Sequence, residues 1–309
     1  MKKTYIIAFI THTILWIYAT QPIRASEDTF SVYSEELTRH LVSAMRKMRA
    51  ESTQSVRICD DCSKTIQPRH IFQRALDIEH HLNAFINMMG QPAADPKIIE
   101  IRPYNTDDTN QIIKRIHNKF EDFSKLSRMI DYTQFTHDHK ELHNKKEDVR
   151  DSFNALDRIE ILLMELGSPS VQPNLVLRRA NMIRALVQKL CTSAPCSAVN
   201  PKSPAPLTFI SPINVFNEAH QLIMLLDLFA HHNGLSIQEG VTVISPSSSI
   251  ITPRQVNRLC GVLLADLIAL NYAKFGSGTI AVEEITGPAN PAQVWEQINY
   301  AKRLLEAAL

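Results

Sequence analysis

The cysteines of this 309-residue chain are the first residues that could do chemistry of their own. Cys59 and Cys62 form a C-x-x-C motif, and Cys191 and Cys196 lie close together in the second half. Such pairs can form disulfides, exchange thiols or hold a metal, but the acidic residues inside the first motif disfavour a reactive thiolate. We predict one local disulfide in each half, with cross-half pairing, a four-thiolate zinc site and free thiols as alternatives. Cys260 falls on an apolar helical stripe, which predicts a buried free thiol.

Histidines could also bind a metal. The densest cluster contains His137, His139 and His143. The last two are four residues apart, a spacing that can place two ligands on one helix face. The segment around them is polar and rich in lysine, so we favour a solvated linker and keep a metal site as the alternative. His231 and His232 fall near the predicted end of a helix, where the helix dipole favours them.

Two aspartates interrupt apolar runs and are candidates for a polar role inside a helical bundle. Asp227 follows two leucines, and Asp266 lies between leucines. We expect both to face water at the edge of an apolar stripe, with burial as the alternative. Together with His220 and Asn271, they are the side chains that a small-ligand pocket between helices would use. The sequence contains no G-x-S-x-G, H-E-x-x-H, P-loop or Rossmann motif, so we assign no catalytic residue and predict no cofactor.

Helices must position these residues. Apolar residues such as Leu259, Leu263 and Leu270 recur with a helical period. Several predicted helices begin with a proline, whose missing N–H is not needed in the first turn, and a hydroxyl residue precedes the proline in two of them. The predicted helix starts are residues 34, 68, 106, 146, 173, 212, 253 and 291.

The first four helix starts recur in the second half at an offset of roughly 140–150 residues, which is typical of a duplication. We therefore predict an all-α protein built as a tandem duplication of a four-helix bundle unit, with eight helices and long proline-rich loops between most of them. The short link around residues 167–170 separates a first bundle at 26–167 from a second at 168–309.

Two details of the inter-helix segments are predicted. Gly90 and Gly234 occupy matching places and are expected to terminate helices, because glycine readily adopts a positive φ. Some strand character at 97–101 or 241–244 would form at most a small ribbon.

Residues 1–25 have the layout of a secretory signal peptide. Lys2 and Lys3 precede an apolar run from Tyr5 to Ala19, and Ala25 precedes the expected cleavage site. The run is shorter than the about 20 residues that a membrane-spanning helix needs. We expect a cleaved, periplasmic or secreted protein without a membrane span in the mature chain, and an uncleaved anchor is the alternative.

The amino-acid composition favours some classes of protein and disfavours others. Hydrophobic residues make up 44% of the chain, and 33 basic residues balance 32 acidic ones. This favours a folded protein over a disordered one and disfavours nucleic-acid binding. The leading hypothesis is an exported, non-enzymatic binding or scaffolding protein that contacts an unknown protein in the cell envelope through its long loops or the groove between halves. The alternatives are a small-ligand sensor or solute-binding domain, a metal or redox protein using the paired cysteines, and an enzyme without a recognisable motif.

Overall fold

The computed structural model describes residues 66–127, 149–203, 209–244 and 250–309. Over these residues the chain is mostly helical and has one two-stranded ribbon, so the predicted all-α class is confirmed. Several predictions lie outside the described residues: the signal peptide at 1–25, the helix starts at 34 and 146, Cys59, Cys62, His137, His139 and His143.

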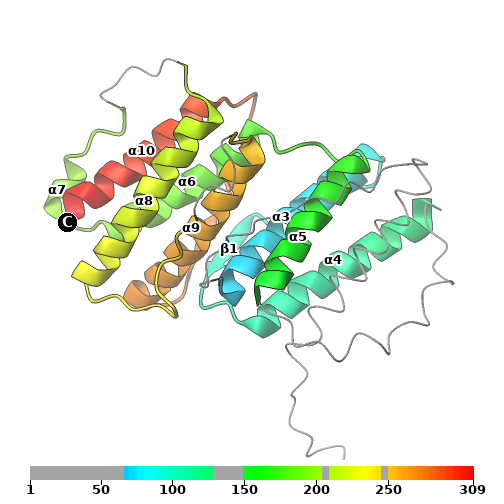
Figure 1. The fold of residues 1–309 in the computed structure, drawn as a ribbon, viewed down its shortest axis with the longest axis horizontal. Helices are drawn as coiled ribbons and strands as arrows, with labels where there is room; N and C mark the ends of the chain where they lie inside the picture. The colour runs from blue at the N-terminus through cyan, green and yellow to red at the C-terminus, as the bar shows by residue number, and fades with distance from the viewer. Residues whose placement is uncertain (1–65, 128–148, 204–208, 245–249) are drawn as a thin grey trace, which may run out of the picture.

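The helices form two groups that lie side by side (Figure 1). The N-terminal helices are α3 (Pro68–Met88), α4 (Thr106–Ser127) and α5 (Val149–Glu165). The C-terminal helices are α6 (Pro173–Leu190), α8 (Pro212–His232), α9 (Pro253–Phe275) and α10 (Pro291–Ala308), with the single turn α7 (Ala194–Ser197) after α6. Within the groups, α3 packs on α4 and α5, while α6 and α8 each pack on both α9 and α10. The groups meet where α3 packs on α9.

The helix starts agree closely with the sequence pattern. Five helices begin at the predicted prolines, and α4 begins at Thr106. Before α9, the Thr252 N–H donates to Oε1 of Gln255 at 2.8 Å, and the Gln255 N–H donates to the Thr252 hydroxyl at 3.4 Å. Equivalent capping boxes precede α8 and α10. These reciprocal bonds satisfy N–H groups that the helix itself cannot pair, so the local sequence fixes where these three helices begin.

Glycine ends two of the helices, as predicted. Gly90 follows α3 with a φ of 82°, and Gly234 follows α8 with a φ of 62°. In both places the next residue donates its N–H to a carbonyl in the last helical turn. The positive φ makes this bond possible, because it turns the chain back over the helix end.

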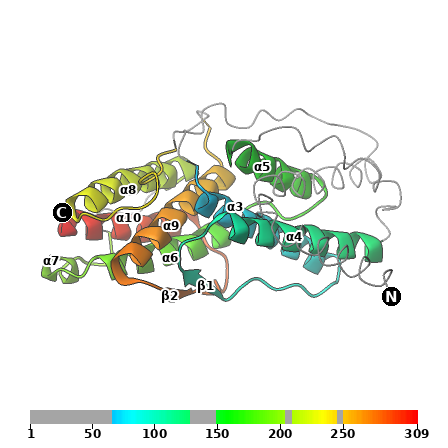
Figure 2. The same ribbon diagram turned by 90° about the horizontal axis from the view of Figure 1, so that it is seen from below.

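A short ribbon joins the two groups of helices. Strand β1 (Ile98–Ile101) pairs antiparallel with β2 (Gly278–Ala281), as Figure 2 shows from below. The predicted ribbon is therefore confirmed at the first of its two proposed locations. Strand β2, the partner of β1, follows α9. The described residues 241–244, the second proposed location, contain no strand.

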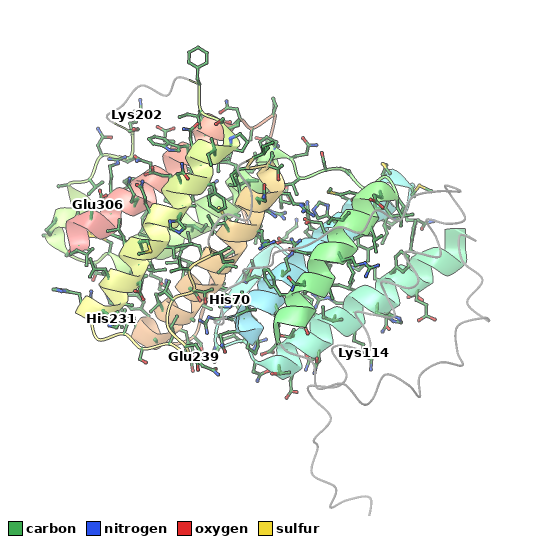
Figure 3. All side chains as sticks on the ribbon, in the orientation of Figure 1. His70, Lys114, Lys202, His231, Glu239 and Glu306 are labelled. Carbon is green, nitrogen blue, oxygen red and sulfur yellow. A yellow bond between two sulfur atoms is a disulfide. The ribbon has the colours of Figure 1, made fainter. Side chains whose placement is uncertain are left out.

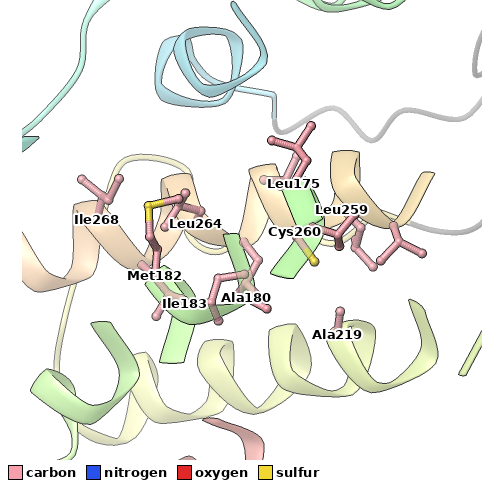
Figure 4. Close-up of a cluster of buried hydrophobic side chains, with 14 of the residues drawn as sticks. Leu175, Ala180, Met182, Ile183, Ala219, Leu259, Cys260, Leu264 and Ile268 are labelled. Carbon is pink, nitrogen blue, oxygen red and sulfur yellow. The ribbon is translucent and has the colours of Figure 1, made fainter. Parts of the chain in front are cut away.

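The C-terminal helices enclose an apolar core. Figure 4 shows side chains of α6, α8 and α9 meeting there, including Ile183, Ala219 and Leu264, which are all fully buried. Cys260 is buried and free, as predicted, and burial raises the pKa of its thiol to about 12. In the described part of the chain, α9 is the one helix long and apolar enough to cross a membrane, but 78% of its apolar window is buried in the protein. Burial against neighbouring helices accounts for its apolar character.

The predicted local disulfide of the second half is confirmed. Cys191 and Cys196 lie at disulfide-bonding distance, five residues apart in sequence and 6.0 Å apart between Cα atoms. This spacing suits a disulfide. The bond closes the turn between α6 and α7, at the end of the C-terminal helices.

Candidate functional site

Charged and polar side chains fill the contact between α3 and the helices around it. Arg69, Gln73, Arg74 and Asp77 all lie on α3 and expose 6%, 1%, 3% and 2% of their surface. A charge buried this deeply is costly unless it is paired and hydrogen-bonded. We call this polar contact of α3 with α5, α6 and α9 the seam.

Asp266 of α9 is at one end of the seam. Its Oδ1 accepts from Nε of Arg69 at 2.7 Å and from Nε2 of His70 at 2.8 Å. Its Oδ2 accepts the Thr242 N–H at 2.7 Å. The residue is fully buried, so the prediction that Asp266 faces water is wrong. The leucines beside it in sequence do not reveal that α3 supplies a cation and a second donor for the carboxylate.

His70 is a neutral donor in this arrangement. Its Nδ1 accepts the N–H of Gln67 at 2.8 Å, so the ring proton is on Nε2 and is donated to Asp266. Burial lowers the pKa of His70 although Asp266 favours the charged form. Burial also opposes ionisation of Asp266, but donors from His70, Arg69 and Thr242 keep its pKa below the ordinary value. Figure 3 shows His70 between α3 and α9. Both ring nitrogens are occupied, so His70 anchors the helices and is not placed to act as a base.

The middle of the seam contains six residues that we call the ionic cluster: Arg74, Asp77, Asp157, Glu160, Arg179 and Arg258. The Arg74 guanidinium lies 2.5 Å from Asp157, 2.6 Å from Glu160 and 3.3 Å from Asp77. Arg179 of α6 pairs with Asp77, and Arg258 of α9 lies 2.6 Å from Asp157. Burial opposes ionisation of Glu160, but Arg74 and His81 hold its pKa well below the usual range. Three arginines balance three carboxylates, and the pairs join four helices.

A small pocket opens beside the ionic cluster, and we call it the junction pocket. Its volume is about 40 Å³, enough for a few water molecules or one small polar group. The walls come from α3, from β1 and the segment before it, from α6 and from the residue after β2. Both groups of helices therefore contribute to it. The polar residues that line it outside the ionic cluster are Gln73, His80, Asp95 and Arg178, and the apolar ones include Leu76, Ile99, Met182 and Val282.

Asp95 lines the junction pocket and binds three side chains beside it. Its carboxylate accepts from Nδ1–H of His80, from Nδ2 of Asn83 at 2.8 Å and from Nη1 of Arg178 at 3.2 Å. Burial opposes ionisation, but His80, Asn83 and Arg178 keep the pKa of Asp95 well below its usual range. A histidine held by a carboxylate through Nδ1 can serve as a general base. The described residues that line the pocket include no hydroxyl or thiol that it could activate.

Gln73 distinguishes the junction pocket from the rest of the seam. It is 1% exposed and lines the pocket, yet neither Oε1 nor Nε2 has a hydrogen-bond partner in the protein. Among the described residues, it is the one buried side chain with both polar atoms unpaired. Leaving a buried polar group without a partner costs about 1–3 kcal/mol. Native proteins leave few such groups, and those few call for an explanation.

The four residues predicted to bind a ligand lie on two helices, α8 and α9. His220 and Asp227 are half-buried on α8. Asn271 is buried and donates to the carbonyls of Leu186 at 3.2 Å and Leu267 at 2.9 Å, which ties α9 to α6. None of the four, Asp266 included, lines the junction pocket. Their role in ligand binding stays a prediction.

The structure describes no group of three or more His, Cys, Asp or Glu side chains that could hold a metal ion in residues 66–127, 149–203, 209–244 and 250–309. The predicted metal ligands His137, His139 and His143 lie outside these ranges. The metal hypothesis for that cluster therefore stays a prediction.

Sequence reasoning missed the polar residues of the junction pocket. A signal for them exists in α3, where Arg69, Gln73, Asp77 and His80 recur with helical spacing. This second stripe is polar and lies beside the apolar stripe of the same helix. In the sequence, this polar stripe has the same pattern as a helix face that is exposed to solvent.

Comparison of the chain with protein-family models, with curated proteins and with solved structures finds no match.

Proposed function

We propose that the protein is an exported, non-enzymatic helical binding protein whose ligand site is the junction pocket. The observation that carries this proposal is the Gln73 amide, which is buried in the pocket wall with both polar atoms unpaired. A buried polar group without partners costs stability, and a ligand that supplies the missing partners removes this cost. Asp95 holds Arg178 and His80 beside it, so the polar groups converge on one small space.

The site also fits the proposed duplication. We propose that residues 26–167 and 168–309 are repeats of one four-helix unit and that the junction pocket lies where they meet. The recurrence of proline and capped helix starts supports this division, as does the place of α3 against α9. Ligand pockets occur preferentially at such boundaries. Export to the periplasm or the medium rests on the sequence of residues 1–25.

A second candidate function is attachment to a protein partner in the cell envelope. One observation favours it: Ile213, Met224 and Leu228 on α8 are 39%, 52% and 55% exposed. Met224 and Leu228 are four residues apart and therefore share a helix face. Replacing both with lysine should abolish co-purification of an envelope protein that binds there, whereas ligand binding in the junction pocket should persist.

Native mass spectrometry of protein purified gently from the host envelope tests the leading proposal. We expect a chain that begins after residue 25 and carries a small additional mass. Arg178→Gln should lose that mass. Arg184→Gln is the matched control, because Arg184 is also a half-buried arginine on α6 but bonds Gln297 at 2.7 Å, outside the pocket. A mass retained equally by both variants would place the ligand elsewhere, and a bare wild-type chain would contradict a tightly held ligand.

A further inference from the structure

We infer that the junction pocket recognises a neutral carboxamide group, one that offers an N–H donor beside a C=O acceptor. The inference rests on the proposed function, because it names the chemistry of the ligand for the same pocket. Two features carry it: the unpaired amide of Gln73 and the balanced charges around it.

The Gln73 amide defines the complementary group. Its Nε2 needs an acceptor and its Oε1 needs a donor, and the two atoms lie side by side on one planar group. Another amide meets both needs, because its C=O can accept from Nε2 while its N–H donates to Oε1. A carboxylate would pair with Nε2 but would bring a second oxygen against Oε1. Turning the Gln73 amide end for end exchanges the two atoms and leaves this requirement unchanged.

The charges of the pocket favour a neutral ligand group. Arg178 is paired with Asp95, and Arg179 is paired with Asp77. The arginines that line the pocket therefore each have a carboxylate partner, and an added charge would meet no unpaired opposite charge among them. A charged group would also lose its hydration on entering the pocket, which is costly without such a partner.

The size and walls of the pocket favour a small group at the end of an aliphatic chain. About 40 Å³ accommodates a few heavy atoms. Leu76 and Met182 offer apolar contact to methylene groups next to the amide. A free small amide and the carboxamide of an Asn or Gln side chain in a peptide share this chemistry, and experiment can separate these two sources.

Nuclear magnetic resonance titration of the ¹⁵N-labelled mature protein tests the inference. The probes are propionamide and propionate, which have similar size but differ in the donor and the charge. We expect propionamide to shift the side-chain NH₂ signal of Gln73 and the backbone signal of Arg178 in a saturable manner. Propionate should leave both signals in place. Gln73→Leu should abolish the propionamide-dependent shift at Arg178, while Gln111→Leu, at an exposed position of α4, should retain it.

The peptides Gly-Gln-Gly and Gly-Glu-Gly separate the two sources of the amide. Saturation by Gly-Gln-Gly at lower concentration than by propionamide identifies a peptide side chain, and the reverse order identifies a free small amide. Saturable shifts with propionate, but not with propionamide, would overturn the amide inference and leave the ligand pocket standing. Absence of any saturable shift at Gln73 with all four probes would overturn both the inference and the proposed pocket.

Discussion

The core of the C-terminal helices and the seam are both buried, but they are built from opposite chemistry. Apolar side chains such as Leu222, Leu264 and Ile298 fill the core, whereas Arg74 and Glu160 meet in the seam. The free energy gained from apolar contact is proportional to the area removed from water and does not depend on direction. Ion pairs require particular atoms to meet, so the seam fixes how α3 lies against its neighbours. The difference indicates that the core supplies stability, whereas the seam supplies placement and the junction pocket.

The largest effect is expected from removing a charge from the middle of the seam. Arg74→Met leaves Asp157 and Glu160 buried without their common partner and should lower the free energy of unfolding by about 3–5 kcal/mol. Arg115→Met is the control, because the Arg115 side chain is 54% exposed in its pair with Glu79 and should matter by about 0–1 kcal/mol. Urea denaturation measures both variants. Equal losses in the free energy of unfolding would show that the buried ion pairs of the seam contribute no more than an exposed surface pair.

The core gives the matching apolar test. Leu264→Ala removes a fully buried side chain where α6, α8 and α9 meet, and should cost about 2–5 kcal/mol through lost burial and the cavity left behind. Unlike Arg74→Met, this variant should leave the salt dependence of stability unchanged. Urea denaturation in low and high salt checks the distinction. A strong change in the salt dependence would undo the contrast between core and seam.

Acid should weaken the seam before the core. The pKa of His70 is lower when folded than when unfolded, so the unfolded chain binds more protons and stability falls below about pH 6.5. The pKa values of Glu160 and Asp266 are also lowered on folding, so their stabilising effect is lost as the pH falls below about 4 towards their folded values.

Hydrogen exchange and urea denaturation between pH 7.5 and 4 measure this loss. Protection in α3 should fall before protection in α10. His70→Gln should remove the part of the pH dependence that begins near pH 6.5. Stability that is constant or increases as wild-type protein is acidified from pH 7 to pH 5 would contradict the account of His70.

A smaller effect is expected at the far end of the C-terminal helices. Replacing Cys191 and Cys196 together with serine opens a loop with a sequence separation of 5 and should cost about 2 kcal/mol, since short loops constrain the unfolded chain least. The melting temperature should fall while propionamide binding in the junction pocket is retained. Loss of that binding would show that the turn after α6 is coupled to the seam.

The sequence predicts the core better than the seam for a physical reason. Apolar periodicity and capped prolines are local signals, so the helices starting at Pro212, Pro253 and Pro291 could be predicted residue by residue. The partners in the seam are far apart in sequence, as Arg74 and Asp157 show. A charged residue on a helix is predicted to face solvent until its partner is known.

Asp266 and the ribbon illustrate the same limit. The apolar neighbours of Asp266 locate it on a buried helix, but Arg69 and His70 decide that its side chain turns inward. Strand β1 was predictable from its own residues, whereas its pairing with β2 depends on how the two groups of helices meet. Gln73 belongs to the polar stripe of α3, but the sequence does not show that its buried amide lacks hydrogen-bond partners.

The most direct test is the difference in free energy of unfolding between wild type and Gln73→Leu without added ligand. The central claim is that the unpaired amide of Gln73 binds a ligand and does not stabilise the fold. Leucine has a similar size and no polar atoms to satisfy, so the variant should be more stable by about 1 kcal/mol while losing propionamide binding. A variant less stable than wild type would show that the amide serves the fold, and would contradict the account.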